Sequence, residues 1–212
     1  MKKTICVLML LCITLLTACG SDETKNKVPK ASPKPTETAR HTAEPVPTPT
    51  LLLPISSPTT FTFCSGVGAW STTVELNKDG TFSGHFSDAN AGETGEGYIA
   101  TVYLCDFAGN FSDIKKVDTY SYSMTLSDLT TTEKSDTEKI EEEVRYVYTT
   151  PYGLEGGEEI LLFLPGIPIE DLPEAFLNWY PGDREYITSP EGELNCYGLY
   201  NVAQEQGFFS EV

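Results

Sequence analysis

The stretch that decides the fold is "AWSTTVELNKDGTFSGHFSD", residues 69–88. Large or apolar side chains alternate with polar ones on both sides of the polar segment "NKDG", residues 77–80. Asp79 and Gly80 are residue types that tolerate the left-handed backbone angles of a tight turn. Because alternation with period two places every second side chain on one face, the stretch predicts a β-hairpin with one buried face.

Further strand-like segments lie on both sides of this hairpin. They are residues 61–64, 98–111 with a kink or bulge at Gly109, 120–129, 144–150, 159–164 and 194–202. Together with the hairpin they give about eight strands, mostly joined by short turns. Antiparallel sheets of this size avoid exposed edges by closing into a barrel or by stacking two sheets. We therefore expect a mainly β domain over residues 61–212, an antiparallel up-and-down barrel or sandwich of about eight strands.

Two segments interrupt the strand pattern. "SDTEKIEEEV", residues 135–144, is polar and acidic, which favours a loop or a short helix. "IEDLPEAFLNWYPG", residues 169–182, predicts one short helix near residues 173–180, which starts near Pro173 and stops before Pro181.

The first 19 residues, "MKKTICVLMLLCITLLTAC", have the three parts of a secretory signal: a basic tip, an uncharged run and small residues. The run is shorter than the roughly 20 apolar residues that span a bilayer. "LTAC", residues 16–19, closely resembles the lipobox of bacterial lipoproteins. The resemblance implies that the signal peptide, residues 1–18, is cut after Ala18. It further implies that Cys19 is lipidated with fatty acyl chains such as palmitate, which would anchor the protein on the extracytoplasmic side of the cell membrane.

Residues 19–60 begin with the cysteine that the resemblance implies is lipidated and continue with a segment rich in Pro, Thr, Ser and Lys. Such a composition cannot bury enough apolar surface to fold, so we expect a disordered stalk. Extended polyproline segments rise about 3.1 Å per residue, so the stalk could reach on the order of 100 Å.

"GAW", residues 68–70, opens the strand that leads into the hairpin. It resembles the Gly-x-Trp start of lipocalins and of lipocalin-like bacterial lipoproteins, in which the tryptophan plugs the barrel floor. The resemblance makes Trp70 a barrel-floor or core candidate. The alternative is a core aromatic residue in another kind of sandwich.

Charge and motifs restrict the function. The chain has 31 Asp and Glu against 14 Lys and Arg, a net charge of -17, and this balance repels nucleic acid. There are two histidines, His41 and His85, and no Gly-x-Ser-x-Gly elbow supplies a nucleophile. We expect His85 to be an exposed strand residue and expect no catalytic residues.

Neither a metal site nor a cofactor is expected. Asp88, Asn90 and Glu93 have a spacing similar to that of a calcium loop, but glycine and glutamate stand at positions that such a loop reserves for a ligand and a glycine. We expect a solvated hairpin loop there. Cys64, Cys105 and Cys196 lack zinc-ligand spacing, and their pairing stays open.

The leading hypothesis is a membrane-anchored extracytoplasmic lipoprotein whose non-catalytic β-domain binds a ligand or a protein partner. One alternative is a structural or accessory envelope protein with a filled barrel. Another is a hydrolase that uses two of the 27 carboxylates in the domain.

Overall fold

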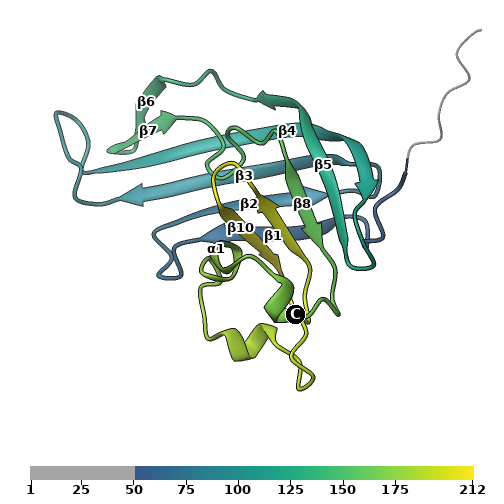
Figure 1. Ribbon diagram of the computed structural model, residues 1–212. Helices are drawn as coiled ribbons and strands as arrows, with labels where there is room; N and C mark the ends of the chain where they lie inside the picture. Colours follow the sequence, from purple (N-terminus) through teal and green to yellow (C-terminus); the bar gives the residue numbers. More distant parts are fainter. Residues whose placement is uncertain (1–50) are drawn as a thin grey trace, which may run out of the picture. The chain divides into compact units, whose positions relative to one another are not determined.

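The computed structural model describes residues 51–212 (Figure 1). The predictions for the signal peptide, for Ala18 and Cys19 and for most of the stalk lie outside these residues. The described strands are β1 (Thr59–Cys64), β2 (Trp70–Leu76), β3 (Thr81–Asn90), β4 (Ala100–Lys116), β5 (Ser121–Thr131), β6 (Thr137–Glu141), β7 (Val144–Tyr148), β8 (Ile160–Phe163), β9 (Gly198–Asn201) and β10 (Gln206–Ser210). The helical turns are η1 (Ile169–Asp171), α1 (Glu174–Leu177) and η2 (Arg184–Ile187).

Eight of the strands form a closed antiparallel barrel in the order β1, β2, β3, β4, β5, β8, β9 and β10. The ring closes where β10 pairs with β1, with Phe61 opposite Ser210. Each barrel strand neighbours the barrel strands before and after it in the chain (Figure 1). This confirms the predicted up-and-down barrel.

The remaining two strands form a hairpin that branches from the ring. Strand β7 pairs in parallel with the first residues of β4, and β6 pairs with β7. The strand predicted at residues 144–150 therefore exists but lies outside the barrel, and the eighth barrel strand is β10, which was not predicted. The prediction of a loop or helix at residues 135–144 was wrong, because residues 137–141 form the exposed strand β6.

The hairpin of β2 and β3 has the predicted turn. Gly80 adopts a φ of 90°. The Asp79 carboxylate accepts hydrogen bonds from the backbone N–H of Thr81 at 3.0 Å and from its hydroxyl at 2.6 Å. In β4 the register with β5 shifts between Asn110 and Phe111, next to the predicted irregularity at Gly109.

The barrel interior is filled by large apolar side chains from all eight strands. Among the most deeply buried are Phe61, Phe63, Leu76, Phe111, Met124, Leu162 and Phe208. Leu53 and Ile55 belong to the same core, and the Leu53 N–H donates to the Lys78 carbonyl at 2.8 Å, in the turn between β2 and β3. The folded unit therefore begins before Phe61, and these two residues cover the barrel end opposite the start of β2.

A second apolar cluster lies outside the ring. It packs Phe163, Tyr200 and Phe209, which lie on β8, β9 and β10, against apolar residues of the segment that contains α1. The predicted short helix is present as α1, over four residues (Figure 1). Phe176 of α1 packs on Phe163 and Phe209, at ring-centroid distances of 5.1 and 4.4 Å. Gly198 and Gly207 leave room for its ring, since a Cβ atom at either position would collide with it. None of the helices within residues 51–212 has the length and apolar character needed to cross a membrane.

Candidate functional site

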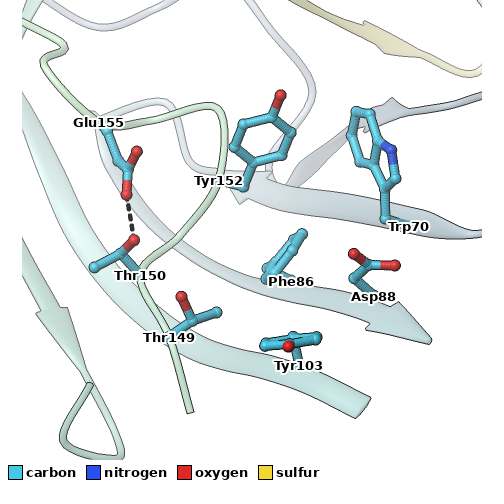
Figure 2. A pocket seen from close by; sticks show the side chains of 8 residues that line it. All are labelled: Trp70, Phe86, Asp88, Tyr103, Thr149, Thr150, Tyr152 and Glu155. Atoms are coloured by element: carbon cyan, nitrogen blue, oxygen red, sulfur yellow. Dashed lines mark hydrogen bonds between the residues drawn. The ribbon is translucent and has the colours of Figure 1, made fainter. Parts of the chain in front are cut away.

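A pocket lies at the barrel end where β2 begins and β3 ends (Figure 2). We call it the mouth pocket. Its volume is ≈ 420 Å³, within the range of small-molecule sites. Its lining consists of Trp70, Phe86, Asp88, Tyr103, Thr149, Thr150, Tyr152 and Glu155.

One wall of the mouth pocket comes from three neighbouring barrel strands. Trp70 of β2 lies opposite Asp88 of β3, and Asp88 lies opposite Tyr103 of β4. Phe86 precedes Asp88 by two residues on the same inward face of β3. Side chains alternate between the two faces of a strand, and directly paired residues of neighbouring strands share a face. These four side chains therefore lie together on the inner face of the barrel.

The other wall comes from the connection between β7 and β8, residues 149–159. The Thr72 hydroxyl donates to the Tyr152 carbonyl at 2.7 Å. The Asn201 side-chain amide donates to the carbonyls of Gly153 and Glu155, at 3.0 and 2.9 Å. Leu154 is fully buried in the barrel core. The connection is therefore fixed to the barrel, and the pocket wall that it forms is preorganised.

Aromatic rings make up half of the pocket lining. Trp70 packs edge-on against Phe63 and Tyr152, with centroids at 4.8 and 5.1 Å, and Phe86 lies 6.0 Å from Tyr152. Trp70 is half-buried and contacts the interior core. It thus lies between the core and the pocket, at the barrel end opposite Leu53. The floor role that the lipocalin resemblance implies for Trp70 stays a prediction.

The charge of the pocket lining is entirely negative. Asp88 and Glu155 are its ionisable carboxylates, and no Lys, Arg or His lines it. Within the described part of the chain neither carboxylate forms an ion pair. Glu155 accepts a hydrogen bond from the Thr150 hydroxyl (Figure 2).

The loop between β3 and β4 is attached to the pocket through Glu93. The Glu93 carboxylate accepts from the Tyr103 hydroxyl at 2.8 Å and from Arg145 of β7 at 2.9 Å. Arg145 also contacts Glu138 of β6 at 2.6 Å. The hydrogen bond to Glu93 raises the pKa of the Tyr103 hydroxyl above its ordinary value. The loop at residues 87–97, predicted to be simply solvated, is thus tied by Glu93 to the pocket wall and to the β6–β7 hairpin.

The other residues considered in the sequence do not line the pocket, although Cys105 pairs directly with Phe86 across the strands. His85 is exposed on β3, with its Nδ1 atom 2.7 Å from Asp106. Cys64, Cys105 and Cys196 are free thiols. Burial raises the pKa of Cys105 to about 11 and that of Cys196 to about 12. Within residues 51–212 no three His, Cys, Asp or Glu side chains come together as metal ligands.

The sequence analysis singled out some of the pocket residues, but for roles other than ligand binding. Trp70 was expected on the barrel floor or in the core, Phe86 and Tyr103 lie in segments that were predicted as strands, and Asp88 was weighed only as a calcium ligand. Thr149, Thr150, Tyr152 and Glu155 were not singled out, since no local pattern places a loop residue on a barrel mouth. Comparisons with protein-family models, with curated proteins and with solved structures gave no match for this chain.

Proposed function

We propose that this chain is a lipid-anchored extracytoplasmic protein whose barrel binds a small ligand in the mouth pocket without transforming it. The observation that carries the proposal is the mouth pocket itself: a preorganised hollow of ≈ 420 Å³ whose lining combines four aromatic residues with two threonines and two carboxylates. Apolar and aromatic walls with a small number of placed polar groups are typical of ligand sites.

The location follows from the lipobox resemblance at residues 16–19. Several acyl chains on Cys19 would hold the protein at the membrane, because each buried methylene contributes about 0.8 kcal/mol. The Pro- and Thr-rich stalk would then separate the barrel from the lipid surface, so that the pocket can sample solutes outside the cell.

The filled interior decides where the ligand would bind. Phe61, Phe63 and Phe208 occupy the space beneath the mouth and are fully buried. A ligand would therefore sit at the mouth, against Trp70 and Tyr152, and not deep within the ring. The same filled interior is the observation that favours the second candidate, a structural or accessory envelope protein that binds no small molecule.

A fragment screen by ligand-observed NMR distinguishes the two candidates. The screen compares the full chain with Thr149→Phe, which fills the mouth pocket, and with Ser83→Phe, which adds the same ring at an exposed position of β3. We expect a set of fragments whose binding signals disappear with Thr149→Phe and persist with Ser83→Phe. If no fragment distinguishes the two variants, the ligand-binding proposal is wrong and the structural role stands.

A further inference from the structure

We propose that the ligand of the mouth pocket is a small organic cation that carries an ammonium group. This inference rests on the proposed ligand-binding function and deepens it. Its starting point is the pair of lining carboxylates, Asp88 and Glu155, which have no cationic partner within residues 51–212.

Arg145 of β7 already forms ion pairs with carboxylates outside the pocket lining. Arg145 donates to Glu93 at 2.9 Å and to Glu138 at 2.6 and 2.9 Å, so three of its donor contacts go to two other carboxylates. Arg184 is bound to Glu174 and Asn178 in the segment outside the ring, and Lys139 pairs with Glu141 on the β6–β7 hairpin. With seven Lys and Arg against 27 Asp and Glu from residue 51 onward, the folded domain offers few other cations.

The aromatic rings of the pocket lining also favour a positively charged ligand. The faces of tryptophan, tyrosine and phenylalanine rings attract cations within about 6 Å of the ring centroid, by about 0.5–2 kcal/mol depending on desolvation. Figure 2 shows the rings of Phe86 and Tyr152 between Asp88 on one side of the pocket and Glu155 on the other. An ammonium group in this space would meet a ring face and a carboxylate together.

Other ligand charges fit less well. An anion would be repelled by both carboxylates, and the negative field of the whole domain would slow its approach. A neutral sugar could stack on Trp70 and donate hydroxyl hydrogen bonds, but both carboxylate charges would stay uncompensated as the ligand displaces water from them. A cation would compensate the carboxylate charges that lose water, and the negative electrostatic field of the domain would attract it to the mouth pocket.

The test is isothermal titration calorimetry of the full chain with choline and cadaverine. Each is paired with its neutral isostere, 3,3-dimethylbutan-1-ol and pentane-1,5-diol, and glucose is titrated as the neutral sugar. We expect both cations to bind at least about tenfold more tightly than their isosteres, with affinity that falls as salt rises. Binding should disappear with Thr149→Phe.

Two substitutions that each remove one negative charge test whether the cation binds in the mouth pocket. Asp88→Asn removes a lining carboxylate, and Asp106→Asn removes an exposed carboxylate beside His85, outside the pocket. We expect Asp88→Asn to weaken cation binding by about tenfold or more and Asp106→Asn to change it by less than about twofold. Thermal melts of both variants check that they are folded, and we expect melting temperatures close to that of the parent protein.

Three results would overturn the inference: isosteres that bind as tightly as the cations, glucose binding without cation binding, or equal effects of Asp88→Asn and Asp106→Asn. Each leaves the proposed ligand-binding function in place if the fragment screen still finds compounds that Thr149→Phe excludes. If the screen and the titrations both find no binding, the proposed function fails together with its ligand class.

Discussion

The side-chain amide of Asn201 donates a 2.9 Å hydrogen bond to the backbone carbonyl of Glu155. Asn201 lies inside the barrel on β9 and is 1% exposed, whereas Glu155 lies in the connection that forms the outer wall of the mouth pocket. A second bond from the same amide reaches the Gly153 carbonyl at 3.0 Å. The pocket wall is thus held from beneath by this buried side chain, together with the buried hydroxyl of Thr72.

The first prediction concerns this support. Asn201→Leu should lower the free energy of unfolding by about 2–3 kcal/mol, because the carbonyls of Gly153 and Glu155 lose their donor in a buried site. It should also weaken ligand binding, since the backbone of Glu155 is no longer held in place. Urea unfolding and calorimetry measure the two effects.

Asn195→Leu is the matched control for Asn201→Leu. Asn195 likewise donates from its amide to a backbone carbonyl, that of Tyr186, but in the segment outside the ring. It should reduce stability without changing ligand affinity. Equal ligand affinity in the Asn201 variant and the parent would show that this side chain does not support the pocket.

The second prediction concerns Trp70, which packs against Phe63 and Tyr152 and lines the pocket. Trp70→Ala should cost about 2–4 kcal/mol, somewhat less than full truncation of a completely buried aromatic residue. Trp179→Ala should cost a similar amount, because Trp179 packs on Phe63 at 4.7 Å and donates to the Glu205 carbonyl. Ligand binding should be lost mainly with Trp70→Ala. Thermal melts that show Trp70→Ala as stable as the parent would exclude the core role of this residue.

The third prediction concerns the thiols. With a pKa of about 11 for Cys105 and about 12 for Cys196, roughly one Cys105 thiol in a thousand is ionised at pH 8, and the thiolate is the reactive form. Brief treatment of the folded protein with iodoacetamide at pH 8 should modify Cys64, which is partly exposed, well before the other two. Because the thiolate fraction rises as pH approaches the pKa, labelling of Cys105 should accelerate between pH 8 and pH 10. Peptide mapping by mass spectrometry reads each site, and fast labelling of Cys196 at pH 8 would contradict its burial.

The fourth prediction tests the anchor. Cys19→Ala should abolish acylation, and the protein should be released or retained as uncut precursor. Metabolic labelling with a fatty acid and detergent phase partitioning measure the outcome. A Cys19→Ala protein that is cut and still enters the detergent phase would disprove lipidation at this residue. Ser21→Ala is a neighbouring control that should leave acylation intact.

The sequence predicted the fold where alternation was strong. The hairpin at residues 69–88 alternates cleanly, and both of its strands are present with the expected turn. Strand β6 was missed because it is exposed along its whole length, so its side chains show no alternation of buried and solvated faces. Strand β10 was missed because Gln206–Ser210 is short and buried on both faces, between the barrel core and the cluster around α1.

The site was harder to predict because half of it depends on contacts between distant residues. Trp70, Phe86 and Tyr103 stand out as aromatic residues on strands. Tyr152 and Glu155 reach the mouth only because Thr72 and Asn201, 80 and 46 residues away, hold their backbone. No sequence pattern within residues 149–155 predicts those two hydrogen bonds.

The most direct test of the account uses the two tryptophans of the chain. Their indole N–H groups give two signals in a ¹H–¹⁵N spectrum, one from Trp70 in the mouth pocket and one from Trp179, whose Nε1 atom donates to the Glu205 carbonyl at 2.6 Å. The Trp179 ring packs 6.3 Å from the Trp70 ring but does not line the pocket. We predict that choline or cadaverine shifts the Trp70 signal saturably, shifts the Trp179 signal less, and leaves both in place in the Thr149→Phe variant. A Trp70 signal that stays fixed in the folded parent protein across the cation titrations and the fragment screen would contradict a ligand site at the barrel mouth.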